Sequence, residues 1–267
     1  MSANTTNPAS SNASADPVQD ALSRFEPATR AARPSRALQK RVDSKFLFSR
    51  ATLPALLRAL ADDFHVVLSA EQRAANYASL YFDTDDRAFF HAHRRGGKPR
   101  HKVRVRHYVE RDLCFLETKT KTKYGVTQKS RRLRAPRDFA LSDDDRAWIE
   151  AAIGPTATLS PSCWIHFPRV TLVGVHHEER LTLDLGLTFD QHDEPVGFDG
   201  AVIAEVKQPR FAPRSPAMRA LRGVGARRRR VSKYCSGIAL LEPTRRSHVF
   251  RPTLRDLHRM DDARSLP

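Results

Sequence analysis

Lys and Arg recur at every second position in several short segments of the chain. The clearest is RHKVRVRHY at 100–108, in which Lys102, Arg104 and Arg106 alternate with apolar or neutral residues. Side chains two positions apart lie on the same face of a β-strand, so these three cations share a face. Arg offers phosphate oxygens a bidentate fork and Lys offers a point charge. The spacing therefore indicates a site for a phosphate-rich anion, built on a strand.

Five further segments repeat this pattern, with charged residues on one face and more apolar residues on the other. Like charges directly opposite on neighbouring strands are destabilising. At about 5 Å and an effective dielectric constant near 20, each such pair costs roughly 3 kcal/mol. A bound anion would relieve this repulsion, so we expect the charged faces to line one anion site. The rows are Arg41, Asp43 and Lys45; Glu117, Lys119 and Lys121; Thr127, Lys129 and Arg131; Arg180, Thr182 and Asp184; and Glu205 with Lys207.

The elements that must position these rows are mainly strands. Alternation predicts eight of them, near 42–48, 77–84, 100–108, 114–121, 127–133, 163–175, 179–189 and 201–208. Apolar stripes and capping residues predict helices near 53–60, 142–154, 215–222 and 232–241. Sequential strands with inserted helices favour an α+β fold with an antiparallel sheet. We expect this sheet to close into an eight-stranded antiparallel β-tunnel, with the charged face inside and the helices packed outside.

The composition limits the function classes and the cellular compartment. The chain has 267 residues, 46 Lys plus Arg and 30 Asp plus Glu, which gives a net charge of +16 and favours a polyanionic partner. No window approaches the roughly 18–20 apolar residues of a membrane span, and the N-terminus lacks the features of a secretory signal. The three cysteines are far apart, so neither a disulfide framework nor a CxxC zinc site is expected. A cytoplasmic protein is predicted.

The chain divides into three parts by composition. Residues 1–33 are rich in Ser, Asn, Ala, Thr and Pro and are predicted to be disordered. Residues 34–243 hold all the predicted strands and form the folded domain. Residues 244–267 contain six Arg and are expected to form a basic C-terminal tail with a surface helix.

Several of these segments together resemble a known family, the VTC catalytic domain. This is the polyphosphate polymerase domain of the vacuolar transporter chaperone complex, within the CYTH or triphosphate tunnel metalloenzyme superfamily. The resemblance implies an eight-stranded tunnel, a Mn²⁺ or Mg²⁺ cofactor, and transfer of the terminal phosphate of ATP to a growing inorganic polyphosphate chain. It rests on RVDSK at 41–45, YFDT at 81–84, KVRVRHY at 102–108, FLETK at 115–119, TQK at 127–129, RLTLD at 180–184, EVK at 205–207 and SKY at 232–234.

The resemblance and the strand rows assign roles to sixteen residues. The family's basic triphosphate-binding positions and its metal-binding glutamate are matched by Lys45, Arg104, Arg106, Lys119, Arg169, Arg180, Arg230, Ser232, Lys233 and Glu205. The rows add Lys102, Lys129, Arg131 and Lys207 for the substrate, and Glu117 and Asp184 beside the metal. Of these, catalytic roles are predicted for Lys45, Arg104, Arg106, Lys119, Arg180 and Lys233. The metal ligands are predicted to be Glu205, Glu117 and Asp184, and the other seven residues are predicted to bind substrate.

The chain departs from the wider family in two respects. The superfamily begins with Glu-x-Glu-x-Lys, whereas this chain has Arg41 and Asp43 before Lys45, so no metal role is expected for the first strand. The regulatory SPX domain and the membrane helices of the eukaryotic complexes are not found in the sequence, so any membrane partner would be a separate protein.

Other functions of the chain, and purely structural roles for some of these residues, remain open at this point. A tripolyphosphate or organic triphosphate hydrolase would use the same fold, and a non-catalytic module could bind a polyanion without turnover. Specific nucleic-acid recognition is not expected, because the strands lack aromatic stacking runs and no helix-turn-helix stands out. Glu205 with Lys207 could be a plain same-face ion pair. Tyr81 is expected in the core, and Asp83 is expected to shape the turn after its strand.

Overall fold

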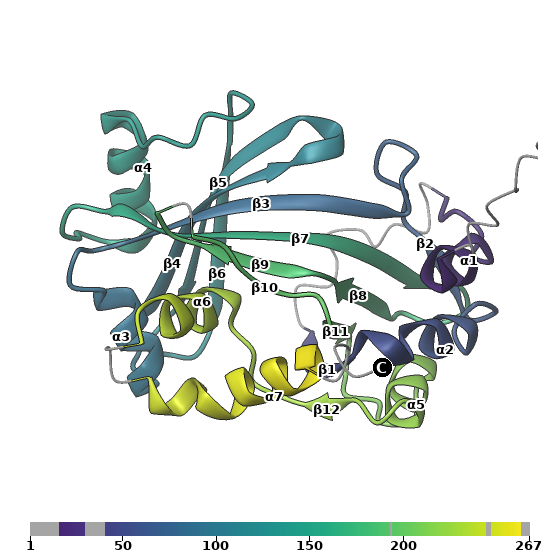
Figure 1. Ribbon diagram of the computed structural model, residues 1–267. Coiled ribbons are helices and arrows are strands. Elements are labelled where there is room, and N and C mark those ends of the chain that lie inside the picture. The colour runs from purple at the N-terminus through teal and green to yellow at the C-terminus, as the bar shows by residue number, and fades with distance from the viewer. Residues whose placement is uncertain (1–15, 30–40, 193, 244–246, 263–267) are drawn as a thin grey trace, which may run out of the picture.

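The protein is built around one large antiparallel sheet. The computed structural model describes residues 16–29, 41–192, 194–243 and 247–262 (Figure 1). The twelve strands are β1 (Val42–Ser49), β2 (Phe64–Val66), β3 (Ala74–Asp83), β4 (Arg100–Tyr108), β5 (Leu113–Lys121), β6 (Thr127–Arg134), β7 (Ser160–Gly174), β8 (Arg180–Asp184), β9 (Leu187–Asp190), β10 (Val196–Phe198), β11 (Ala201–Gln208) and β12 (Arg227–Arg228). The α+β antiparallel class predicted from the sequence is confirmed.

The sheet does not close into the ring that we expected. Its hydrogen-bonded path runs β12-β1-β11-β8-β7-β3-β4-β5-β6, and within the described ranges both β12 and β6 are ends of that path. The strand count is also larger than eight. One predicted strand is broken into β8 and β9 at Gly186, whose φ of 45° is left-handed. The strands β2, β10 and β12 have only two or three residues, too few for alternation to reveal.

Helices pack on both faces of the sheet. They are α1 (Pro17–Ser23), α2 (Leu53–Arg58), α3 (Ala88–Arg95), α4 (Asp143–Ile153), α5 (Pro216–Gly223), α6 (Lys233–Leu241) and α7 (Arg251–Asp262). Figure 1 shows α2 beside α5, α6 beside α7, and α4 at the far end of the sheet, beside β5. The helices α6 and α7 share a core with Leu47 and Ile203, which lie on the same strand faces as Lys45 and Glu205. None of the helices in the described part of the chain is long and apolar enough to cross a membrane.

The burial of the strands matches the alternation in the sequence. Val103 and Val105 of β4, Leu181 and Leu183 of β8 and Val206 of β11 are fully buried. These positions belong to cores formed with the covering helices. The charged rows lie on the opposite face, which α6 and α7 cover in part and which elsewhere surrounds a cavity.

The N-terminal region corrects one prediction. Residues 16–29, which we expected to be disordered, include α1, which starts with the Val18 amide donating to Asp16 Oδ1 at 3.0 Å. Leu22 and Phe25 are only 1% exposed and pack in the same core as α2. The Ser- and Asn-rich composition concealed this short amphipathic segment. Residues 1–15 and 30–33 lie outside the described residues.

The C-terminal region forms the predicted helix. In α7, Leu257 is fully buried against the core that contains α6, so this helix packs on the domain. The division into three parts at residues 33 and 243 stays a prediction.

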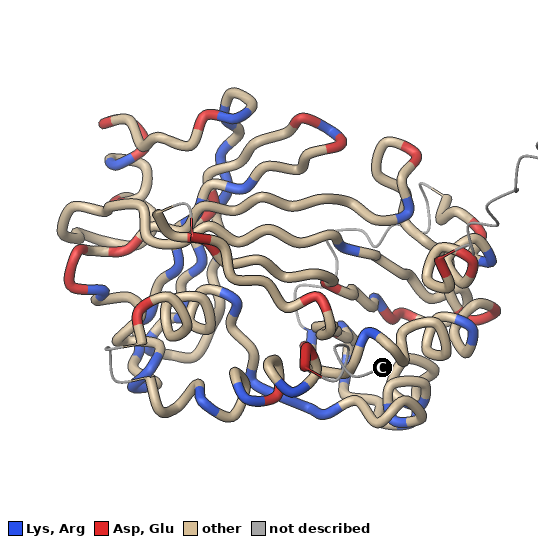
Figure 2. Tube along the Cα trace, viewed as in Figure 1, with Lys and Arg blue, Asp and Glu red and all other residues tan. Residues whose placement is uncertain are grey.

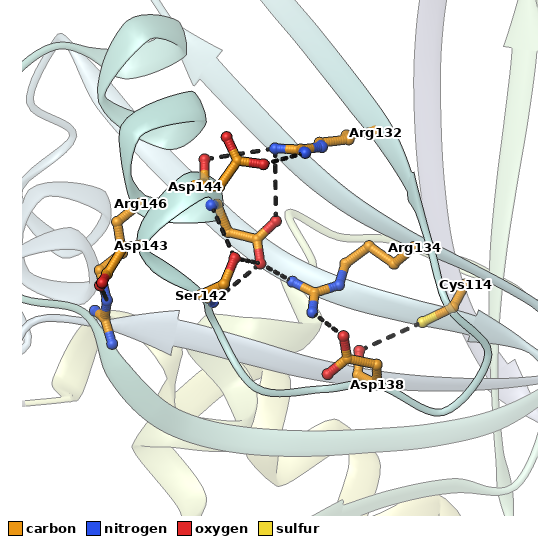
Figure 3. Close-up of polar contacts among 9 residues, drawn as sticks. Cys114, Arg132, Arg134, Asp138, Ser142, Asp143, Asp144 and Arg146 are labelled. Atoms are coloured by element: carbon orange, nitrogen blue, oxygen red, sulfur yellow. Dashed lines mark hydrogen bonds and ion pairs between the residues drawn. The ribbon is translucent and has the colours of Figure 1, made fainter.

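A cluster of ion pairs fixes α4 to the outer side of β6 (Figure 3). Ser142 and Asp145 form a reciprocal capping box at the start of the helix. Arg134 donates to Asp145, and Arg132 donates to Asp144. Arg132 and Arg134 therefore hold the helix, whereas Lys129 and Arg131, on the other face of the same strand, line a cavity. The cations on one face of β6 thus hold α4 in place, and the cations on its other face line the cavity.

Candidate functional site

The charged rows meet in one cavity of about 720 Å³. Its walls come from β1, β3, β4, β5, β6, β7, β8 and β11 and from the start of α6. Since β1 lies near one end of the sheet path and β6 at the other, the sheet must curl around the cavity. Figure 2 shows Lys and Arg concentrated along β4, β5 and β6. Among the described residues, twelve Lys and Arg side chains line the cavity, together with three carboxylates, Asp43, Glu117 and Glu205.

Fourteen of the sixteen residues assigned from the sequence line this cavity. They are Lys45, Lys102, Arg104, Arg106, Glu117, Lys119, Lys129, Arg131, Arg169, Arg180, Glu205, Lys207, Ser232 and Lys233. Asp184 is buried behind the wall and is 2% exposed. Arg230 is exposed and lies outside the lining, because the chain turns inward only after Val231, which is buried. The structure therefore brings the predicted set together with these two exceptions.

The two predicted metal-binding glutamates are each paired with a cation. Arg104 Nε donates to Glu117 Oε2 at 2.7 Å, and Lys207 Nζ donates to Glu205 Oε2 at 2.8 Å. Burial raises the pKa of Glu205, but the ammonium groups of Lys207 and Lys45 outweigh it and hold that pKa well below its usual range. Burial also raises the pKa of Glu117, but Arg104 and Arg106 outweigh it and lower that pKa, so both carboxylates are anionic at neutral pH.

Asp184 holds two lining cations in place from behind. It accepts a hydrogen bond from Arg169 Nη2 at 2.9 Å and another from Lys233 Nζ. Burial raises the pKa of Asp184, yet the charges of Arg169 and Lys233 hold it well below the usual range. Asp184 therefore orients cations, and its place behind the wall differs from the metal-ligand role predicted for it.

Arg41 pairs with Asp43 at 3.1 Å, whereas seven other lining cations have no carboxylate partner among the described residues. Across the described ranges, no ion pair forms at Lys45, Lys102, Arg106, Lys119, Lys129, Arg131 or Arg180. Lys45 Nζ donates to the Val231 carbonyl at 3.0 Å, and Lys102 Nζ donates to Ser232 Oγ at 2.7 Å. Neutral oxygens of this kind leave the cationic charge uncompensated, so the cavity is set up to receive an anion.

Repulsion between the lining cations affects the pKa of Lys119. Removal from bulk water and the charges of Lys102 and Lys45 lower the pKa of Lys119 to about 8. Lys45 belongs to β1 and Lys119 to β5, so these charges face one another across the curled sheet. An anion between them would replace repulsion with attraction.

Tyr81 is a lining residue that the sequence analysis placed in the core. It is 4% exposed and does pack in the core, but its hydroxyl reaches the cavity and accepts a hydrogen bond from Arg104 Nη1 at 2.7 Å. Burial raises the pKa of Tyr81, but Arg104, Arg106 and Lys102 together bring it down to about 8. Tyr81 and Arg104 are cross-strand partners, and the sequence alone does not show the register that brings them together.

The donor set fits a divalent ion only when the ion arrives with a phosphate substrate. In the described part of the chain, no three His, Cys, Asp or Glu side chains gather closely enough to hold a metal ion. Mg²⁺ often uses one or two carboxylates together with substrate phosphates and water. Glu205 and Glu117 line the cavity and could supply those carboxylates.

Comparisons with known proteins give one family and several distant structures. The model of the VTC domain family matches residues 40–242. No curated protein matches the chain in sequence. HpAC1 from Hippeastrum, a protein with a dominant triphosphatase activity, is 14% identical at a TM-score of 0.46, covering 74% of this chain and 94% of its own. A candidate adenylate cyclase from Bacillus halodurans is 13% identical at a TM-score of 0.46, and the match covers 72% of this chain and 95% of that protein.

Proposed function

The chain belongs to the VTC domain family, and from this premise we propose that it is a polyphosphate polymerase, which transfers the terminal phosphate of ATP to a growing inorganic polyphosphate chain. The observation that carries the proposal is the cavity in which twelve cations face three carboxylates. Such an excess suits a run of linked phosphates, each with its own negative charge. Mn²⁺ or Mg²⁺ is the proposed cofactor, bound with the substrate and held from the protein side by Glu205 and Glu117.

The lining residues would act by neutralising charge and holding the phosphates in line. Phosphoryl transfer needs little covalent help from the protein, so positioning and electrostatics supply most of the rate enhancement. Arg104 and Arg106 on β4 and Lys119 on β5 can contact oxygens of successive phosphates from one wall. A phosphate acceptor is already ionised at neutral pH and needs no general base. When bound, the divalent ion would add further charge neutralisation at the phosphate oxygens.

The product of the reaction tests the proposal directly. Purified protein is incubated with γ-labelled ATP and Mn²⁺, and the products are resolved on a gel. A ladder of acid-insoluble polymer is expected. Free phosphate alone would show that the protein is a triphosphate hydrolase, and no turnover at all would show a polyanion-binding module. Either of these results would overturn the polymerase assignment.

Tripolyphosphate is expected to raise the melting temperature strongly at pH 7 and much less at pH 9.5. A ligand at about a hundredfold its Kd adds about 2.7 kcal/mol, which is several degrees at roughly 2–4 °C per kcal/mol. Burial lowers the pKa of Lys233 to about 8, and Lys119 also titrates near 8. Both ammonium groups lose their protons as the pH rises through 8, and a polyanion binds the protonated form, so the stabilisation falls above that pH.

Differential scanning fluorimetry at constant ionic strength measures this effect. Orthophosphate and duplex DNA serve as controls, because the first carries one phosphate and the second is too wide for the cavity. A shift that is independent of pH, or one that DNA reproduces, would contradict binding inside the cavity.

A further inference from the structure

Two of the family motifs in the sequence meet at a buried hydrogen bond that the proposed reaction does not use. Asp83 ends β3 and is fully buried. Its carboxylate accepts hydrogen bonds from the Thr84 amide at 2.8 Å and from the Phe89 and Phe90 amides at 2.9 Å each. A further donor is the hydroxyl of Tyr234, from the SKY motif at 232–234. Asp83 therefore does more than shape the turn after its strand.

The acceptor side of this bond is rigid. The amides of Phe89 and Phe90 belong to the first turn of α3, so Asp83 is tied both to the end of β3 and to the start of that helix. A carboxylate that is held by three backbone amides has little freedom to follow a moving partner. The bond therefore forms only when the Tyr234 hydroxyl is placed within reach of this fixed acceptor.

The donor side lies next to the cavity. Tyr234 is in the first turn of α6, directly after Ser232, which caps the helix, and Lys233. Lys102 donates to Ser232 and Lys233 pairs with Asp184, so both residues take part in the cavity wall. The first turn of a helix is where its backbone opens most easily. A bond from Tyr234 to a rigid acceptor would restrain that turn.

The ring of Tyr234 extends the restraint to a second lining residue. It stacks on the ring of Tyr81, with centroids 5.2 Å apart and an interplanar angle of 17°. Tyr81 in turn accepts the hydrogen bond from Arg104. The position of the Tyr234 ring thus sets the surface against which Tyr81 and Arg104 are placed.

We propose that Asp83 and Tyr234 are positioning residues, whose buried hydrogen bond fixes the first turn of α6 so that Ser232 and Lys233 stay in the wall of the cavity. This inference rests on the proposed function, since it assigns the pair to the binding of the phosphate chain. Neither side chain lines the cavity, so neither contacts the substrate.

The other end of α6 offers a matched control. Arg87 donates to Glu242 Oε1 from Nε at 2.9 Å and from Nη2 at 2.7 Å, just after the last turn of the helix. Figure 1 shows α3 and α6 side by side, and these two contacts join the segment around α3 to both ends of α6. Weakening the second contact should loosen α6 far from the cavity.

The test compares Tyr234→Phe with Glu242→Gln in the full-length protein. Tyr234→Phe keeps the stacked ring and removes only the hydroxyl group, whereas Glu242→Gln keeps an acceptor and removes the charge. We expect both variants to melt at a lower temperature than the wild type. By titration calorimetry, we expect the affinity for tripolyphosphate to fall about tenfold in Tyr234→Phe and to stay within twofold of wild type in Glu242→Gln. Amide hydrogen exchange should accelerate at residues 232–236 only in Tyr234→Phe.

The possible failures can be told apart. If the wild-type protein does not bind tripolyphosphate, the proposed function fails and this inference fails with it, before any variant is compared. If the wild type binds and Tyr234→Phe binds equally well, the positioning role alone is overturned. Equal losses of affinity in the two variants would also overturn it, because they would reflect general loosening of α6.

Discussion

Glu205→Gln is expected to lower the turnover of ATP by a factor on the order of 10²–10³ without weakening tripolyphosphate binding in the absence of metal. Within the described part of the chain, the carboxylate is one of three in the cavity lining, and it attracts the ammonium groups of Lys207 and Lys45. Removing that charge takes away the main protein ligand proposed for the metal. It also makes the cavity more positive, so an anion alone should bind at least as tightly as before.

Steady-state rates at several Mn²⁺ concentrations and metal-free calorimetry measure the two halves of this expectation. Asp43→Asn is the matched control, because Asp43 also lines the cavity and pairs with a neighbouring cation, Arg41, at 3.1 Å. We expect this variant to retain most of the turnover. Near-wild-type activity of Glu205→Gln at limiting Mn²⁺ would show that the metal assignment is wrong.

Arg106→Ala is expected to weaken tripolyphosphate binding by about 10- to 100-fold, the value of one or two hydrogen bonds to a charged group. Arg106 is 7% exposed, donates to Ser79 Oγ at 3.0 Å and lies over the ring of Tyr77, 5.1 Å from its centroid. Burial and the nearby charge of Arg104 lower the pKa of Arg106, and within the described ranges it lacks the close compensation of a paired carboxylate. A bound phosphate would supply it.

Arg227→Ala is the control for this effect. Arg227 lies on β12 with its side chain 53% exposed and 3.6 Å from Asp256. Screening by water makes such a charge worth little, so we expect a loss of less than threefold. Arg106→Lys should fall between the two, because Lys keeps the charge and loses the fork. Equal losses in all three variants, measured by calorimetry, would indicate diffuse binding over the basic surface.

The sequence was most informative where a strand is long and one of its faces is apolar. The segment at 100–108 was predicted as a strand with the bounds that β4 has, because its valines and cations alternate without interruption. The same alternation placed Lys102, Arg104 and Arg106 on one face, and the structure confirms that all three line the cavity. Local patterns of this kind depend only on residues close in sequence.

Features that depend on distant parts of the chain could not be predicted in the same way. Alternation does not show whether a sheet closes, since that depends on how far it curls. It also cannot distinguish Arg131, which lines the cavity, from Arg132, which holds α4, without the partner carboxylate of Asp144. Tyr81 was missed for a similar reason, because its contact with Arg104 depends on the register between two strands.

The ion pairs in and behind the cavity wall have a consequence for ligand selection. Glu117, Asp184 and Glu205 already satisfy Arg104, Arg169 and Lys207, so an incoming anion competes with carboxylates that are permanently present. A single phosphate can offset the loss of these ion pairs with only one set of contacts. In a chain of phosphates, the first contact holds the next group at a high effective concentration, so later contacts form with little further entropic cost. We therefore expect the internal carboxylates to weaken the binding of orthophosphate more than the binding of a phosphate polymer, so that the cavity would discriminate between ligands by chain length.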